Sequence, residues 1–492
     1  MNERRSPSAG DRRAAASPGR TGAVAAAAGA ALALAGCMNL IPAYERPAAP
    51  IPAGYPAETM PASAAGAPIA AELEWQRFFA DPRLQRLIGV ALENNRDLRI
   101  AVLNIEQARA AYQVRRADQL PSVGGGANVT RQPAGNGNLV NTYSVGLAMS
   151  SYELDLFGRV RSLSEAALAQ YLATAEARKA VHIALIGSVA TTYLALLADD
   201  EQLRVTRQTL ATREDSLRLT KLKFDYGAAS ELDYRQAESL LEGARATLAQ
   251  LLRQRALDED ALRFLIGQQI PDDLPPPLAL DAGQVEEELR PGLPSELLER
   301  RPDIRAAEEQ LRAANASIGA ARAAFFPRIS LTANLGTAST QLSNLFEGGT
   351  YAFTGAGQLL APIFDAGRNQ ANLEVARANQ AIAVAQYERA IQTAFREVAD
   401  ALAGRATLGE QLRAQLAQAN AEQVRFRLSD LRYRNGAASY LEVLDAQRSL
   451  FAAQQAVVQV QAARVQNLVT LYRVLGGGWS EAAAAAEAVS VR

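Results

Sequence analysis

Residues 227–230 read Gly-Ala-Ala-Ser, and the same four residues recur at 436–439. Each copy lies inside a long stretch without proline, residues 134–270 in the first case and 363–492 in the second. An internal proline costs a helix about 3 kcal/mol or more, so such stretches favour very long helices. The two strings are then sharp turns within helix pairs, which the sequence predicts at 160–266 and 368–475.

Apolar residues spaced seven apart run along both predicted helix pairs. A helix over 160–226 would be roughly 100 Å long at 1.5 Å per residue, and such a helix is not stable alone. A seven-residue apolar period is typical of coiled-coil packing, so we expect each helix to pack along its length on others. The two series are Leu203, Leu210, Leu217 and Phe224, and Leu444, Phe451, Val458, Val465 and Tyr472.

The two turns belong to a tandem duplication. Displacing the chain by 206–209 positions also aligns Leu120-Pro121 with Phe326-Pro327, and Gly158-Arg159 with Gly367-Arg368. Several anchors in the same order indicate an internal repeat. The predicted organisation is repeat 1 at 79–270, an inter-repeat segment at 271–294, repeat 2 at 295–475 and a C-terminal tail at 476–492.

Each repeat also contains a predicted β-hairpin, at 122–154 and at 328–363. In the first, Tyr143, Val145, Leu147 and Met149 alternate with small and polar residues. Segments of about ten residues with this period are typical of outer-membrane strands, although a hairpin on a soluble domain is the alternative interpretation. Four strands with open edges cannot cross a bilayer, so the membrane interpretation requires a homo-oligomer.

The N-terminus has the features of an export signal over residues 1–36. Several arginines precede an apolar run, Ala23 to Leu34, which is short for a membrane span. Small residues then precede Cys37, the only cysteine in the chain, as in a lipobox whose cysteine is acylated. An ordinary cleavage site is the alternative. Seven prolines between Pro42 and Pro68 predict that 37–78 is a lipid anchor followed by an extended tether.

Composition excludes several classes of protein. The 51 Lys and Arg nearly balance the 52 Asp and Glu, whereas nucleic-acid-binding proteins usually carry a basic excess. One histidine, His182, and one cysteine leave no basis for a His/Cys zinc site, a disulfide framework or a histidine-based hydrolase. We therefore expect no enzyme, cofactor, metal site or nucleic-acid partner. Residues 180–198 are apolar enough for a transmembrane helix, but a buried helix face is the favoured interpretation.

Four strings in the chain resemble those of the TolC-type outer-membrane efflux factors, in the lipoprotein branch of OprM and NodT. They are Tyr-Glu-Leu-Asp-Leu-Phe-Gly at 152–158, Arg-Arg-Pro-Asp-Ile at 300–304, Phe326-Pro327, and Tyr-Leu-Glu-Val-Leu-Asp-Ala-Gln-Arg at 440–448. The resemblance implies a mainly α protein with membrane β-structure. Long coiled-coil helices would form an α-barrel, and four strands per chain would complete a twelve-stranded β-barrel in a homotrimer.

The same resemblance implies a location and a function. The protein would sit in the outer membrane of a Gram-negative cell, anchored by acylated Cys37 and extending into the periplasm. It would be the passive exit duct for small molecules in a tripartite pump, with a periplasmic adaptor and an inner-membrane transporter of the resistance-nodulation-division kind. A periplasmic coiled-coil scaffold lipoprotein without a pore is the alternative.

The turns are the first candidate site. Gly227 and Gly436 suit the left-handed position after a helix, and Ser230 and Ser439 suit helix N-caps. Asp233 and Glu442 stand three residues later and would complete capping boxes. By resemblance the turns form the periplasmic tip that an adaptor contacts. The tip residues are Gly227, Ala228, Ala229, Ser230, Gly436, Ala437, Ala438 and Ser439.

The second candidate site is a periplasmic gate. The resemblance places Asp445 at the constriction of the pore, with Glu442 and Leu441 beside it. A ring of carboxylates would produce a negative field that selects cations, although a lone surface aspartate is usually only solvated. Gln236 corresponds to Asp445 in the first repeat, so the second turn alone would supply the ring. The family's latch arginine corresponds to Ala438, which leaves the closed-state lock unassigned.

Overall fold

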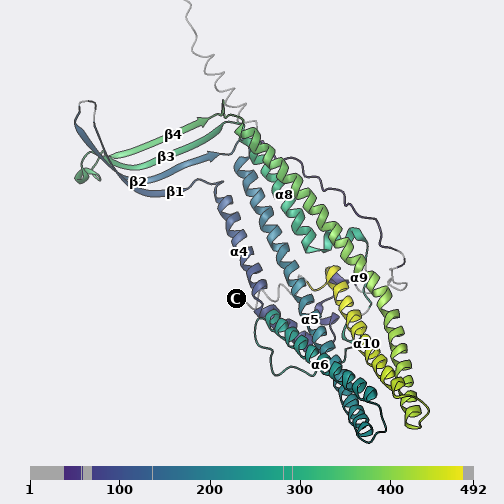
Figure 1. The fold of residues 1–492 in the computed structure, drawn as a ribbon. Helices are drawn as coiled ribbons and strands as arrows, with labels where there is room; N and C mark the ends of the chain where they lie inside the picture. The colour runs from purple at the N-terminus through teal and green to yellow at the C-terminus, as the bar shows by residue number, and fades with distance from the viewer. Residues whose placement is uncertain are drawn as a thin grey trace, which may run out of the picture. The chain divides into compact units, whose positions relative to one another are not determined.

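The computed structural model shows long helices and one sheet (Figure 1). The predicted export signal, Cys37 and residues 480–492 of the predicted tail lie outside the residues that it describes. Those residues are 38–56, 58, 69–133, 135, 137–280, 282–286, 288–290 and 292–479.

The chain divides into two compact units, each assembled from three segments. The first, here called the strand unit, comprises Met1–Ala43, Val114–Glu165 and Asn315–Arg377. The second, called the helix unit, comprises Tyr44–Gln113, Ala166–Ala314 and Ala378–Arg492. Each unit therefore combines segments from both predicted repeats.

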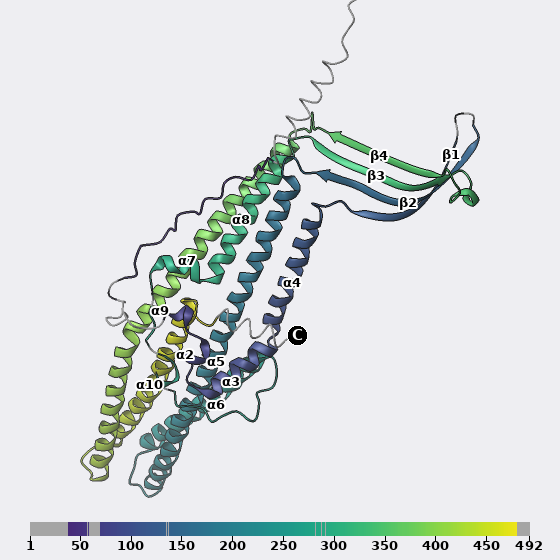
Figure 2. The same cartoon turned by 180° about the vertical axis from the view of Figure 1, so that it is seen from behind.

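The described residues of the strand unit contain one antiparallel sheet, in the order β1-β2-β3-β4. Its strands lie side by side in Figures 1 and 2, and their positions confirm the two predicted hairpins. Pairing of β2 with β3 joins the hairpins into one sheet, which the sequence did not predict. A short helix, η6 (Leu342–Asn344), lies in the β3–β4 connection. The strands are β1 (Val123–Pro133), β2 (Leu139–Leu154), β3 (Arg328–Ser339) and β4 (Tyr351–Leu360).

The register gives the sheet one apolar and one polar face. Leu147 pairs with Leu335, which pairs in turn with Phe353, so these three side chains share a face. On the opposite face Ala148 pairs with Asn334, which pairs with Thr354. Side chains alternate between the two faces of a strand, so the alternation read from the sequence extends across β2, β3 and β4.

Two facing glycines bring β2 and β3 unusually close. Gly146 pairs with Gly336, and a Cβ on either residue would meet backbone atoms of the opposite strand. Further along β2 the register shifts between Met149 and Tyr152, where Ser151 has a positive φ of 51°. Close approach at glycine and a bulge are both ways in which a sheet acquires strong local curvature.

The segment that follows Cys37 is held by the strand unit. The Met38 N–H donates to the Leu156 carbonyl at 3.1 Å, and Arg322 donates to the Leu40 carbonyl at 3.1 Å. The Asn315 side chain donates to the Pro42 carbonyl at 2.9 Å. The predicted tether is therefore docked at its start rather than free.

Four long helices run through the helix unit, and the two that start at Arg159 and Arg368 begin in the strand unit. They confirm the predicted helix pairs, because their ends lie within a residue or two of the expected positions. Shorter helices, two of which end in the strand unit, and the inter-repeat segment complete the helix unit. The long helices are α5 (Arg159–Asp225), α6 (Glu231–Ile266), α9 (Arg368–Arg434) and α10 (Tyr440–Val474). The others are η3 (Ala70–Glu72), α2 (Trp75–Phe78), α3 (Pro82–Asn94), α4 (Arg96–Ala117), η4 (Ala282–Gln284), η5 (Pro294–Glu296), α7 (Leu297–Arg300) and α8 (Pro302–Ala323).

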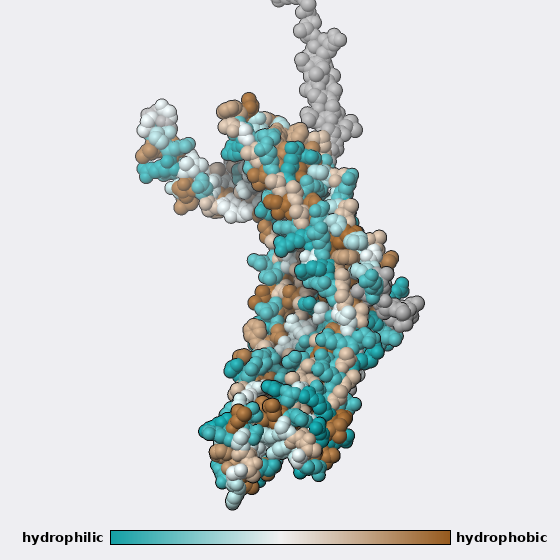
Figure 3. Space-filling model, turned by 45° about the vertical axis from the view of Figure 1, so that its right-hand side comes forward, coloured by the Kyte–Doolittle hydropathy of each residue, from teal (hydrophilic) through white to brown (hydrophobic). Residues whose placement is uncertain are grey.

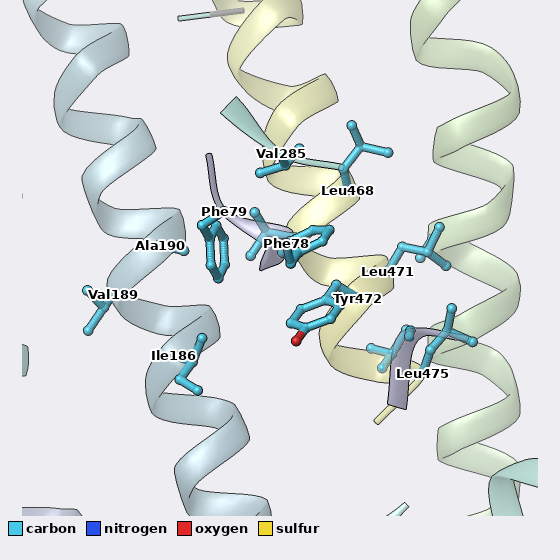
Figure 4. Packing of buried hydrophobic residues seen from close by; sticks show 14 of the residues in the cluster. Phe78, Phe79, Ile186, Val189, Ala190, Val285, Leu468, Leu471, Tyr472 and Leu475 are labelled. Atoms are coloured by element: carbon cyan, nitrogen blue, oxygen red, sulfur yellow. The ribbon is translucent and has the colours of Figure 1, made fainter. Parts of the chain in front are cut away.

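The largest apolar cluster of the helix unit surrounds Phe78, Phe79 and Tyr472 (Figure 4). The rings of Phe78 and Tyr472 stack with centroids 3.9 Å apart, and the Tyr472 hydroxyl donates to the Leu73 carbonyl at 2.6 Å. The prediction that the tether extends to residue 78 is therefore wrong at its C-terminal end. From η3 onward these residues bury large aromatic side chains, so they belong to the core.

The inter-repeat segment pairs with the same region through backbone β-bridges. Val285 forms an antiparallel bridge with Phe79, and Arg290 forms a parallel bridge with Ile69. Gln284 is buried and donates to the Ala279 carbonyl at 2.6 Å. The equatorial role assigned to 271–294 stays a prediction.

The apolar part of α5 packs inside the helix unit. Within the part of the chain that the structure describes, α5 is the one helix long and apolar enough to cross a membrane, and 61% of its apolar window is buried. Ile186, Val189 and Tyr193 are buried in the main cluster, which favours the buried-face interpretation. His182 packs edge-on against Trp479 with centroids 5.0 Å apart, and burial lowers its pKa to about 4.

One face of the molecule shows how hydrophobic side chains are distributed on the surface. On the face drawn in Figure 3, hydrophobic side chains form separate patches among hydrophilic ones over the helices.

Candidate functional site

Both Gly-Ala-Ala-Ser turns lie at the same end of the helix unit, where α5 meets α6 and α9 meets α10 (Figures 1 and 2). Gly227 has φ 74° and Gly436 has φ 71°, which confirms the predicted left-handed conformation. The Ala228 N–H donates to the Lys223 carbonyl at 2.7 Å, and the Ala437 N–H donates to the Arg432 carbonyl at 2.8 Å. Bonds of this span define the Schellman motif, in which an L-residue at the glycine position would be strained.

The first turn also contains the predicted capping box. The Asp233 N–H donates to the Ser230 hydroxyl oxygen at 3.1 Å, and the Ser230 N–H donates to the Asp233 carboxylate at 3.2 Å. Both residues therefore satisfy backbone donors that would otherwise lack partners at the start of α6.

The second capping box is absent, and its prediction is wrong. Ser439 has N-cap backbone angles but makes no side-chain capping bond. Glu442, expected to complete the box, instead faces Arg432 of α9, with Oε2 3.3 Å from Nη1. Arg432 also donates to the Ala437 carbonyl at 3.2 Å, so this arginine links the turn to α10. The sequence pattern could not reveal this, because Arg432 competes for the carboxylate from across the turn.

This difference predicts unequal effects of two matched substitutions. Ser230→Ala should destabilise the α5–α6 turn by about 1 kcal/mol, because it removes a capping acceptor, whereas Ser439→Ala should cost only a few tenths of a kcal/mol. Amide hydrogen exchange in the first turns of α6 and α10 would measure both effects. Equal acceleration of exchange in the two variants would contradict the assignment.

Two tyrosines hold the helix pairs against each other beside the turns. Lys223 of α5 donates to the Tyr433 hydroxyl of α9 at 2.9 Å, and its ammonium lies 4.4 Å from the centre of that ring. The Ser216 and Tyr440 hydroxyls are 2.6 Å apart and join α5 to α10. Ala237, Tyr440, Val443 and Leu444 form a small buried cluster between them. Sequence analysis missed these links, for which the only signal was a tyrosine on either side of the second turn.

Asp445 is not a lone carboxylate. Arg448 donates to its Oδ1 at 2.8 Å, and Arg425 of α9 donates to its Oδ2. These hydrogen bonds, first that of Arg448 and then that of Arg425, hold the pKa of Asp445 below its usual range. Arg425 also contacts Glu422 at 3.1 Å, so the local charges balance within one chain.

The other predicted gate residues differ in their surroundings. Leu441 is exposed beside the second turn, while Glu442 is paired with Arg432 as described above. Gln236, which corresponds to Asp445 in the first repeat, is half-buried on α6. In the described residues no group of three or more His, Cys, Asp or Glu is placed to hold a metal ion.

The profile of the family described as "Outer membrane efflux protein" matches residues 87–268 and, separately, residues 293–477. The chain belongs to this family. Two matches to one profile also confirm the tandem repeat read from the sequence.

Known relatives match this chain over most of its length. It is 47% identical to the probable efflux pump outer membrane protein TtgC of Pseudomonas putida over 456 residues, which cover 91% of this chain and 94% of TtgC. It is also 47% identical to the outer membrane protein OprJ of Pseudomonas aeruginosa, with 92% and 95% coverage. The crystal structure of the open state of the MtrE outer membrane channel of Neisseria gonorrhoeae superposes with a TM-score of 0.81 at 42% identity, and covers 89% of this chain and 98% of MtrE.

These similarities decide between the two functions considered from the sequence. The protein is an outer-membrane efflux channel with a TolC-like fold, and the scaffold without a pore is disfavoured. TtgC and MtrE are described as an efflux pump outer membrane protein and an outer membrane channel, and not as enzymes.

Proposed function

We propose that three copies of this chain form the exit duct of a tripartite efflux pump. The observation that carries this proposal is the sheet of the strand unit, in which β1 and β4 are the edge strands and one face is apolar. An edge strand in hydrocarbon needs a partner for its backbone groups, and β4 of one copy can pair with β1 of the next. The apolar face with Leu147, Leu335 and Phe353 then meets lipid, and the face with Asn334 and Thr354 lines the lumen.

A periplasmic adaptor is proposed to contact the two turns, and an inner-membrane transporter to supply the energy. The turn residues Gly227, Ala228, Ser230, Gly436, Ala437 and Ser439 are exposed, while Ala229 and Ala438 are half-buried. Both turns have fixed Schellman geometry at the same end of the helix unit, so they present small side chains to a partner without rearrangement.

Acylation of Cys37 is proposed as the membrane anchor. The support is the lipobox-like sequence, together with the docking of Met38 on the strand unit. Intact-mass measurement of the mature protein should show acyl chains on an N-terminal cysteine. A mature chain that begins elsewhere would refute the lipid anchor.

Asp445, Glu442 and Leu441 are proposed to line the periplasmic gate, with a mixed-charge character rather than a bare carboxylate ring. Asp445→Ala leaves Arg425 and Arg448 without this shared acceptor, so the pore entrance becomes more positive and cation block should weaken several-fold. Conductance in planar bilayers, measured with divalent cations on the periplasmic side, checks this. Asp215→Ala is the control, since Asp215 is an exposed surface residue of α5 paired with Arg218.

The same recordings test the function itself. Unmodified protein should give discrete channels in the bilayer and heat-resistant trimers in outer-membrane fractions. A soluble monomer without conductance would refute the duct. Wild-type channels whose conductance and cation block survive Asp445→Ala would instead refute only the gate role.

A further inference from the structure

Arg213 of α5 is a buried arginine outside the candidate sites. It is 5% exposed, and its Nη1 donates to the Leu240 carbonyl of α6 at 2.7 Å. Its guanidinium lies 5.1 Å from the centre of the Phe451 ring of α10. Its buried Nε has no hydrogen-bond partner among the described residues.

In the described part of the chain, no carboxylate lines the cavity beside Arg213 or offsets its charge. Arg213 lines a cavity of about 90 Å³ between α5, α9 and α10, and the other lining residues are glutamine, threonine, leucine and phenylalanine. The next residue, Glu214, is half-exposed and contacts Arg245 of α6 instead, at 3.3 Å. Burial alone lowers the pKa of Arg213, and no charged group offsets that desolvation. A buried charge without a partner is strongly destabilising, so this arrangement calls for a counter-ion.

A second unsatisfied group lies in the wall of the same cavity. Gln447 of α10 is 8% exposed, and its Oε1 has no hydrogen-bond partner among the described residues. A side-chain amide can be rotated by half a turn, which replaces the oxygen with an NH₂ donor. Exposed Gln208 and Thr212 of α5 stand at the mouth of the cavity, so a solute can reach it from water.

We propose that this cavity binds a small monovalent anion, chloride in salt solution, between the Arg213 guanidinium and the Gln447 amide. A volume of about 90 Å³ holds more than one water molecule, whose share of liquid volume is about 30 Å³, and thus has room for a halide. The anion would neutralise Arg213 and connect α5 with α10, in a cavity that α9 also lines. The competing account is a single water that bridges Arg213 Nε to Gln447 Oε1, which would leave the charge unbalanced.

The test is the thermal unfolding midpoint of the purified full chain at constant ionic strength, with chloride replaced by gluconate, which is too large for the cavity. Raising chloride from the lowest concentration to about 100 times the dissociation constant should raise the midpoint by about 3 °C. Arg213→Gln should abolish this dependence. Arg207→Gln, at an exposed position of the same helix, should retain it. A wild-type midpoint that does not respond to chloride would overturn the proposal in favour of water.

Crystals of the wild-type chain grown in bromide provide a measurement that does not need a folded variant. An anomalous peak beside Arg213 and Gln447 is the expected result. Bromide is similar in size to chloride, so its absence from a cavity that shows ordinary water density would overturn the anion site.

Discussion

Replacing Arg301 with alanine should lower the free energy of unfolding of the helix unit by about 2–4 kcal/mol. Arg301 is buried at the start of α8, and its Nε and Nη2 donate to the Asp303 carboxylate at 3.0 and 2.7 Å. Nη2 also donates to Glu397 of α9 at 2.8 Å, and Nη1 donates to the Val474 carbonyl at the end of α10 at 3.2 Å. One side chain thus joins three helices. Both carboxylates remain partly exposed, which keeps the loss below that of a fully buried pair.

The adjacent Arg300 is a matched control. It is paired with Glu296 at 2.7 Å within one helical turn, so Arg300→Ala should cost less than about 1 kcal/mol. Arg301→Lys keeps the charge but not the planar fork, and should fall between the two alanine variants. Denaturant unfolding followed by circular dichroism would rank the three. Equal losses for Arg300→Ala and Arg301→Ala would show that the Arg301 network contributes little.

Stability of the α5–α6 contact should fall as the pH rises from about 4 to about 7, because Asp199 keeps its proton in the folded chain. Asp199 of α5 is buried beside Asp258 of α6. Burial first, and then a hydrogen bond and repulsion from Asp258, raises the pKa of Asp199 to about 7, while Arg255 opposes the shift. Two carboxyl groups that share one proton are stable together only while that proton remains.

The free energy of unfolding falls with rising pH because the folded chain binds one proton more than the unfolded chain. Between pH 4 and pH 7 the folded chain holds a proton on Asp199 that the unfolded chain has released, so each unit of pH reduces the free energy of unfolding by up to about 1.4 kcal/mol. The total loss is at most about 4 kcal/mol and is complete above pH 7. Asp199→Asn keeps a neutral polar group and should be nearly independent of pH in this window, and more stable than wild type at pH 8.

Hydrogen exchange of α6 amides around Asp258 at pH 5 and pH 8, corrected for intrinsic rates, would measure the part of this loss that falls between these pH values as a decrease in protection of up to about 100-fold. Asp200→Asn is the control, because Asp200 is half-exposed and paired with Arg255 at 2.6 Å. It should retain most of the wild-type pH dependence. The same dependence in Asp199→Asn as in wild type would show that another group is responsible.

Local signals in the sequence predicted the elements well. The ends of the long helices could be predicted from the limits of the proline-free stretches and from Gly227 and Gly436. This is because the backbone stereochemistry of proline and glycine does not depend on distant contacts. The capping-box prediction is confirmed at Ser230 and is wrong at Ser439. In the second turn Arg432 captures Glu442, and a helix cap cannot be predicted when a charged side chain from the preceding helix competes for it.

The ionic partners of individual residues were less predictable than the positions of the helices and strands. The sequence predicts a ring of carboxylates at Asp445 but not its pairing with Arg425, because Arg425 is 20 residues away on another helix. Arg213 gave no signal at all, since a heptad pattern does not show which polar residue is enclosed when four helices meet. The hydrogen bonds from Asn315 and Arg322 to backbone carbonyls of residues 40–42 have no signal in the proline-rich sequence, because any residue can offer a backbone carbonyl.

The long helices and the four strands follow from residue spacing within single segments, and the duplication follows from the comparison of two segments. How the duplicated halves combine depends on tertiary contacts. The strand unit takes a hairpin from each repeat, joined by β2 and β3, and the helix unit takes a helix pair from each, joined by contacts such as that of Ser216 with Tyr440. A hairpin with open edges leaves backbone groups unpaired, and a helix pair with an apolar seam leaves that seam exposed, so neither is stable alone. Only pairing between the halves satisfies them.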